Sequence, residues 1–170
     1  MIRNERIVKL SRDHHASLLF CWKLRQGVKR HASWEKMLEY VRYFWDHHFS
    51  AHFEEEEKIL FAPLKDQLVE KAFDDHKEIK ELIDNLDSSE PENIRQKLLQ
   101  LADIVDEHVR YEERILFPHL ETILTEEQLA EIGRKISTDT LMDNYEDDFW
   151  SKPKSLSKFK DISDSSISAL

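Results

Sequence analysis

The strongest constraint in this sequence is a segment of ten residues that occurs twice. Residues 52–61 (HFEEEEKILF) align without a gap with residues 108–117 (HVRYEERILF), and both begin with His-x-x-x-Glu. An Asp-His pair at residues 13–14 precedes the first copy and recurs at 75–76 before the second. The order His, His-x-x-x-Glu, His, His-x-x-x-Glu predicts that one pair of structural elements is repeated as a second pair.

These elements are predicted to be helices. The chain has only 2 Gly and 4 Pro in 170 residues and lacks the long alternation of apolar and polar residues that is typical of strands. Ser33 and Thr125 are candidate N-caps, Pro63 ends one helix, and Pro91 fits the first turn of another. The helices are expected at about 11–30, 33–60, 66–86, 91–116 and 125–136.

Long helices joined by short connections predict an all-α fold, a four-helix bundle in which neighbouring helices run antiparallel. We place this bundle, with the short fifth helix, in residues 1–136. Residues 137–170 are expected to form an acidic segment and then, from Ser151, a flexible tail rich in Ser and Lys.

The repeated His and Glu side chains are expected to face the interior. Residues four apart share a helix face, which pairs His52 with Glu56 and His108 with Glu112. Apolar residues seven positions before or after these histidines indicate that the face is buried; they are Trp45, Ile59, Leu101 and Ile115.

The single histidines have similar neighbours, with Leu18 and Cys21 following His14, and Ile79 and Ile83 following His76, at helical spacing. Six side chains from four helices are therefore expected to meet in the core. The candidate metal ligands are His14, His52, Glu56, His76, His108 and Glu112.

Buried carboxylates without a counter-charge are very unfavourable, and metal cations supply that charge. Imidazole and carboxylate ligands without a thiolate suit iron, manganese or zinc. Two carboxylates that can bridge, with two imidazoles on each side, indicate a pair of metal ions.

The composition excludes several other classes of protein. A net charge of −10 and a pI of about 5.4 argue against a nucleic-acid partner, because phosphate binding needs a basic face. A single cysteine excludes an internal disulfide and a Cys-rich metal site within this chain. No segment resembles a signal peptide or a membrane span, so we expect a cytoplasmic protein without a membrane partner.

On the motif His14, His52-x-x-x-Glu56, His76, His108-x-x-x-Glu112, the chain resembles the hemerythrin-like (HHE cation-binding) family over roughly residues 10–120. The resemblance implies an up-down-up-down four-helix bundle around two iron ions joined by an oxo or hydroxo bridge. It also implies that the four histidines bind iron and that the two glutamates bridge or chelate the pair.

Two positions depart from the oxygen-carrying hemerythrins. Those proteins have a further His one turn before the ligand on the third helix, where this chain has Ala72. They have an acidic ligand five residues after the last His, which is Glu113 here; we choose Glu112 because it matches Glu56 in the repeat. His48, one turn before His52, is either an additional ligand or outer partner, or a core side chain lining the pocket.

The remaining polar side chains near the motifs are expected to lie outside the centre. Glu54, Glu55 and Glu57 are predicted to be solvated. Asp13 and Asp75 are weak candidates as outer hydrogen-bond partners, because sequence neighbours on a helix point apart. The other histidines are expected to be exposed, outer or incidental; they are His15, His31, His47 and His119.

The sequence favours a di-iron protein that binds O2, NO or peroxide at an open metal position, for sensing, scavenging or iron handling. Apolar neighbours such as Leu18, Trp45 and Ile115 are expected to limit water there. One alternative is an enzyme that turns over peroxide or repairs iron–sulfur centres after NO stress, although a binding protein is favoured. Another is a metal-free helical module whose acidic 137–150 segment binds a protein partner.

Overall fold

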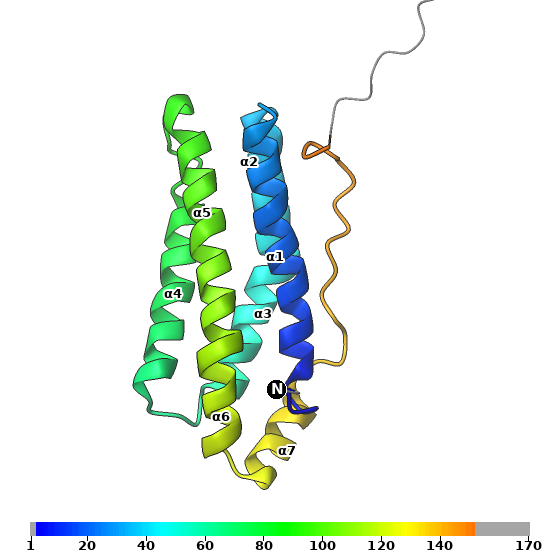
Figure 1. The fold of residues 1–170 in the computed structure, drawn as a ribbon, viewed down its shortest axis with the longest axis vertical. Coiled ribbons are helices and arrows are strands. Elements are labelled where there is room, and N and C mark those ends of the chain that lie inside the picture. Colours follow the sequence, from blue (N-terminus) through cyan, green and yellow to red (C-terminus); the bar gives the residue numbers. More distant parts are fainter. Residues whose placement is uncertain (1–2, 152–170) are drawn as a thin grey trace, which may run out of the picture.

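The computed structural model describes residues 3–151, which form a bundle of four long antiparallel helices with a shorter helix at one end (Figure 1). The first helix, α1, is Val8–Lys29. The second is continuous and comprises α2 (Trp34–Phe44), η1 (Trp45–Phe49), α3 (Ser50–Glu55) and η2 (Glu56–Leu60). The third is α4 (Gln67–Asp84). The fourth comprises α5 (Pro91–Tyr111), η3 (Glu112–Leu116) and α6 (Phe117–Ile123), and α7 (Glu126–Lys135) follows.

Capping residues explain where these helices begin. Ser33 accepts a hydrogen bond from the Lys36 N–H, and Asp66 accepts one from the Leu68 N–H at 2.8 Å. Thr125 and Gln128 form the predicted capping box of α7. The all-α bundle is therefore confirmed, with α1 beginning at Val8 rather than near Ser11.

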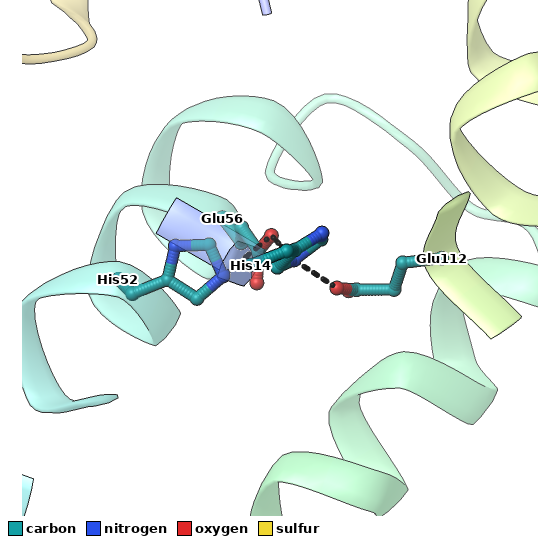
Figure 2. Close-up of side chains that lie close together, drawn as sticks. All are labelled: His14, His52, Glu56 and Glu112. Carbon is teal, nitrogen blue, oxygen red and sulfur yellow. Dashed lines mark ion pairs between the residues drawn. The ribbon is translucent and has the colours of Figure 1, made fainter. Parts of the chain in front are cut away.

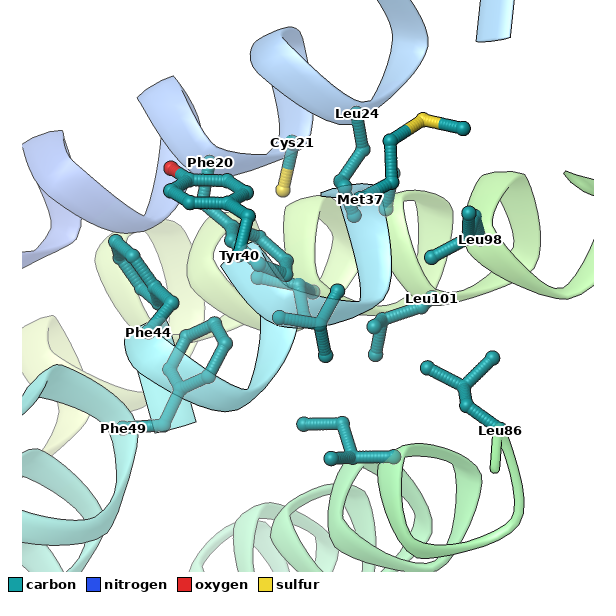
Figure 3. Packing of buried hydrophobic residues seen from close by; sticks show 14 of the residues in the cluster. Phe20, Cys21, Leu24, Met37, Tyr40, Phe44, Phe49, Leu86, Leu98 and Leu101 are labelled. Carbon is teal, nitrogen blue, oxygen red and sulfur yellow. The ribbon is translucent and has the colours of Figure 1, made fainter. Parts of the chain in front are cut away.

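The core consists of two apolar clusters stacked along the bundle. The larger is built around the aromatic side chains Phe20, Tyr40, Phe44 and Phe49 (Figure 3). The smaller, nearer α7, contains Leu10, Leu60, Phe61, Leu116 and Phe117. On α1, His14 lies between Leu10 of the smaller cluster and Phe20 of the larger, so a polar layer separates the two.

Residues 137–151, which we call the strap, run without regular secondary structure along the outer side of α1 (Figure 1). Tyr145 packs against Tyr40 and Tyr43, and Phe149 is buried. The expected flexible tail beyond the strap lies outside the described residues. Among residues 3–151, no helix has the length and apolar character needed to span a membrane.

Two predicted core residues are not in the core. Ile115 is 49 % exposed and Leu18 is 37 % exposed. Ile115 lies in η3, a π-helical segment, and the wider π turn takes a residue seven positions after His108 off the buried face. On α1 the buried face follows His14, Ser17 and Cys21, which leaves Leu18 at its edge.

Candidate metal centre

The six candidate ligands lie together in the polar layer between the apolar clusters. Each of the four long helices contributes at least one of them, and all are at most 3 % exposed. Figure 2 shows His14 from α1, His52 and Glu56 from the second helix, and Glu112 from the fourth, directed toward one another. The arrangement brings together side chains nearly one hundred positions apart in the sequence (Glu112 and His14).

The ligand atoms form two overlapping groups, within each of which all atoms lie within 4.8 Å of one another. The first group is His14, His52, Glu56 and Glu112. In it, His14 Nε2 is 3.0 Å from Glu112 Oε2 and 3.8 Å from Glu56 Oε1. His52 Nε2 is 3.3 Å from Glu56 Oε1.

The second group is Glu56, His76, His108 and Glu112, so both glutamates belong to both groups. His76 Nε2 is 3.3 Å from Glu56 Oε2, and His108 Nε2 is 3.4 Å from Glu112 Oε2. The Nε2 atoms of His76 and His108 are only 3.1 Å apart. Both imidazoles thus direct the same nitrogen toward one point beside the shared carboxylates.

The other nitrogen of each imidazole faces a carboxylate on a different helix. His14 Nδ1 is 2.7 Å from Glu113 Oε1, and His76 Nδ1 is 2.9 Å from Glu57 Oε1. These contacts connect the two halves of the repeat in both directions. The side chain of Glu57 is 36 % exposed and so is partly solvated as expected, but it also contacts His76. Glu113 is likewise an outer partner in this structure.

Asp75 has the same role for His108, whereas Asp13 lies beside His52 without a hydrogen bond to it. Asp13 Oδ2 is 3.5 Å from His52 Nδ1, and Asp75 Oδ2 is 3.4 Å from His108 Nδ1. Each aspartate points away from the histidine beside it in sequence and toward the neighbouring helix. A carboxylate on Nδ1 orients the ring and directs the Nε2 lone pair inward.

The π-helical segments η2 and η3 begin at Glu56 and Glu112. A π turn contains more residues than an α turn, so successive side chains diverge less around the axis. Glu56 and Glu57 can therefore both reach the interior, one toward the shared centre and the next toward His76. The same holds for Glu112 and Glu113.

Several atoms of the centre have no hydrogen-bond partner although they are buried. They include both carboxylate oxygens of Glu56, both of Glu112, and Nε2 of His14 and of His52. Unpartnered buried carboxylates are strongly destabilising. Divalent cations between the two groups would supply the missing interactions, so the residues present fit a binuclear metal site.

Two histidines of the centre have raised pKa values. Burial disfavours the charged form of His14, but the Glu112 and Glu113 carboxylates outweigh it and raise the pKa of His14 to about 10. Burial likewise opposes the charge on His76, and Glu56 and Glu57 outweigh it to raise the pKa of His76 to about 9.

The pKa values of three other candidate ligands are shifted toward the neutral form. Burial lowers the pKa of His52 and of His108, and the charge on His14 lowers that of His52 further. Burial and the nearby Glu112 charge raise the pKa of Glu56. A metal ion entering the centre must therefore displace protons from it.

His48 belongs to neither ligand group among the described residues. It is buried, its Nε2 is 3.1 Å from the Asp13 carbonyl oxygen, and its ring stacks on Phe44 with centroids 4.5 Å apart. Burial lowers the pKa of His48 to about 4. These contacts favour the core interpretation of this side chain over the ligand interpretation.

Of the other side chains, Glu54 is exposed as expected, whereas Glu55 binds Lys9 at 2.6 Å. Ala72 is fully buried one turn before His76. The remaining histidines lie outside both groups; they are His15, His31, His47 and His119.

A family model described as the hemerythrin HHE cation-binding domain matches residues 6–120 and, in a second placement, residues 67–137. The chain belongs to the hemerythrin HHE cation-binding family. The second placement begins at α4, where the repeat begins its second half. Comparisons with curated proteins and with solved structures found no match.

Membership of the HHE family confirms the resemblance inferred from the motif. The chain is thus an HHE cation-binding domain with a buried His/Glu cluster arranged as two overlapping groups. The strap extends past residue 137, where the second placement of the family model ends.

Proposed function

We propose that this protein holds two iron ions through the six buried ligands and binds a small molecule, O2, NO or peroxide, at their open positions. The observation that carries the proposal is the pair of ligand groups sharing Glu56 and Glu112, with both carboxylates otherwise unpartnered. The bound metals would supply redox chemistry and open coordination positions. Histidine and carboxylate ligands with open positions are typical of non-haem iron.

The number of ligands supports an open centre. Each group offers two imidazoles and the same two carboxylates, which is too few to fill two six-coordinate shells. With Ala72 at the position of the additional His of oxygen carriers, the two halves have equivalent ligands. This equivalence supports ligand binding that involves both metals, and it separates this chain from carriers with unequal metal sites.

A groove of about 650 Å³ between the second helix and α4 offers a route to the centre. Its walls include Trp45, Phe53 and Phe73, and it reaches His76, on which Phe53 stacks with centroids 3.9 Å apart. Of the apolar neighbours expected from the sequence, Trp45 lines this groove, whereas Leu18 and Ile115 are partly exposed to solvent. The rest of the lining is polar or charged and includes Glu54, Lys77 and Lys80, so aromatic side chains form only part of the wall.

The contacts of the strap argue against the alternative of a metal-free module whose acidic segment binds a protein partner. Two of its acidic residues already form ion pairs with the chain's own bundle, Asp143 with Lys23 and Asp147 with Lys36, each at 2.7 Å. A protein partner would have to compete with these contacts. The metal-binding proposal is therefore preferred.

Optical spectroscopy of the full chain loaded anaerobically with Fe(II) tests the proposal. We expect new visible absorption after addition of O2, and a distinct spectrum after addition of NO. Iron-loaded protein whose spectrum responds to neither ligand nor to peroxide would contradict small-ligand binding. Consumption of many equivalents of peroxide per chain would instead support the enzymatic alternative.

A further inference from the structure

The strap is fixed to the bundle by buried polar contacts. Asp143 Oδ2 accepts hydrogen bonds from Lys23 Nζ at 2.7 Å and from the Tyr40 hydroxyl at 2.6 Å. The side chains of Lys23 and Asp143 are 7 % and 1 % exposed. Phe149 covers Gly27, where a Cβ atom, if the residue had one, would lie 2.8 Å from the Phe149 ring.

The strap also reaches the outer partner of the metal centre. The Leu141 N–H donates a hydrogen bond to Asp13 Oδ1 at 2.9 Å. The other oxygen of this carboxylate, Asp13 Oδ2, is 2.8 Å from Lys9 Nζ and 3.5 Å from His52 Nδ1. Both Asp13 Oδ2 and His52 Nδ1 are buried and have no hydrogen-bond partner, so each is the polar atom available to the other. One backbone hydrogen bond therefore separates the strap from a carboxylate that faces a candidate ligand.

A second connection supports the same carboxylate. At the start of the strap, the Ser137 N–H donates to Glu55 Oε1 at 2.9 Å, and Glu55 Oε2 is 2.6 Å from Lys9 Nζ. Lys9 thus joins Glu55 to Asp13. The side chain of Asp13 is fully buried by these neighbours.

The repeat supplies an internal comparison. Asp75 is the counterpart of Asp13, and Lys71 is 2.6 Å from Asp75 just as Lys9 is 2.8 Å from Asp13. Asp75 faces His108, but its side chain is 17 % exposed, whereas that of Asp13 is 0 % exposed. The described contacts of Asp75 include none with the strap. The strap therefore makes the outer surroundings of the two halves unequal, although their inner ligands are equivalent.

We propose that the strap is a positioning element for one half of the metal centre: it holds Asp13, which orients His52, and so strengthens metal binding at the His14–His52 group. Metal binding there stabilises the docked strap in return, because coupling between two sites is reciprocal. The metal-linked part of this inference rests on the proposed metal function. Loss of such an outer partner weakens metal affinity by about 10- to 100-fold.

Stepwise metal titration of the full chain, with Co(II) as a spectroscopic probe, tests the first half of the proposal. Leu141→Pro removes the N–H that Asp13 accepts. We expect it to weaken one of the two binding steps by about 10-fold and to leave the other unchanged. Met142→Pro, one residue along at a side chain that is 65 % exposed, is the matched control and should change neither step.

Variants of Asp13 and Asp75 show which ligand group is responsible for the metal-binding step that Leu141→Pro weakens. Asp13→Asn should weaken the same step as Leu141→Pro, and Asp75→Asn should weaken the other. Adding Leu141→Pro to Asp13→Asn should produce little further loss, because the strap acts through Asp13. Equal weakening of both steps by Leu141→Pro, or no weakening, would overturn the proposal.

Hydrogen exchange of the strap tests the linkage and separates its failure from failure of the metal function. In the wild-type chain, metal loading should slow exchange across 138–151, and unchanged exchange would overturn the linkage. In metal-free protein, Asp13→Ala should speed exchange at Leu141, and an unaltered rate would overturn the contact itself. One further outcome is a protein that binds no metal and still shows faster exchange at Leu141 in Asp13→Ala. That result would refute the proposed function and the metal linkage, and only the contact between the strap and Asp13 would stand.

Discussion

At the scale of single residues, each imidazole of the centre uses its two nitrogens differently. Nε2 faces the shared glutamates, and Nδ1 faces a carboxylate on another helix, as in His14 with Glu112 and Glu113. The outer carboxylate fixes the ring and makes the inner nitrogen a better ligand. The candidate centre therefore contains ten polar side chains, six inner and four outer.

Replacing an inner ligand should abolish metal binding at the centre. Glu56→Ala removes a carboxylate that both groups share, and His52→Ala removes one imidazole of the first group. We expect both variants to lose iron as measured by metal analysis after loading. The control Glu54→Ala changes an exposed residue on the same helix and should keep its iron; equal loss from all three would refute the assignment of the buried face.

Replacing an outer carboxylate should weaken binding without abolishing it. Glu113→Gln keeps the size of the side chain but removes the charge facing His14. We expect metal affinity to fall by about 10- to 100-fold in a competition titration with a chelator. Unchanged affinity would mean that Glu113 serves only its ion pair with Arg3.

The grouping of the six inner side chains could be predicted from the sequence, whereas the contacts of the four outer carboxylates could not. Spacing by four on a helix and the repeat are local patterns, and they identified His52 with Glu56 and His108 with Glu112 as neighbours. The contact between Glu57 and His76 depends on how two helices pack and on a π turn at Glu56. Neither property can be read from residue spacing.

At the scale of helices, the π-helical segments at Glu56 and Glu112 let two adjacent glutamates serve the centre. Helix ends were largely predictable, because caps such as Ser33 and Thr125 act locally. The exposed position of Ile115 could not be predicted, because it follows from the π turn. The packing of the strap depends on contacts with distant residues such as Lys23 and Tyr40, and its acidic sequence alone does not specify them.

Close packing between α1 and the strap predicts the effect of a small substitution. In Gly27→Ala, the new methyl group would lie 2.7 Å from Met37 Sδ and 2.8 Å from the Phe149 ring. We expect a loss of about 1–3 kcal/mol in the free energy of unfolding, measured by denaturant titration, with faster exchange in the strap.

A second glycine provides the control for this substitution. The nearest atoms to a methyl group in Gly133→Ala are Arg6 Cβ and Cδ at 3.1 Å and Arg6 Cα at 3.3 Å, which are farther away than the atoms around Gly27 and would have to shift by only a few tenths of an ångström. The loss in the free energy of unfolding should be smaller for Gly133→Ala than for Gly27→Ala, because alanine also favours the helix more than glycine does. A larger effect at Gly133 than at Gly27 would contradict the packing described for the strap.

At the scale of the whole molecule, the fold encloses a polar layer between two apolar clusters. Without metal, this layer is stabilised by protons on His14 and His76, whose pKa values are about 10 and about 9, compared with 6.5 for an ordinary histidine. Folding therefore retains protons that the unfolded chain releases. The stabilisation is complete below pH 6.5 and is lost as the pH rises through 9 to 10.

Thermal unfolding of the metal-free protein should report this proton dependence. We expect the melting temperature to fall between about pH 7 and pH 10, because the folded state binds more protons there. Metal affinity should rise over the same interval, because metal ions compete with those protons. A melting temperature that rises through this interval in the presence of a chelator would contradict the account.

The number of iron ions bound by the full chain is the most direct test of the central claim, that four helices assemble one binuclear centre from two shared glutamates and four histidines. Anaerobic titration with Fe(II), followed by removal of excess metal and elemental analysis, should give two ions per chain, one for each ligand group. A chain that retains no iron, or only one ion under saturating conditions, would contradict it.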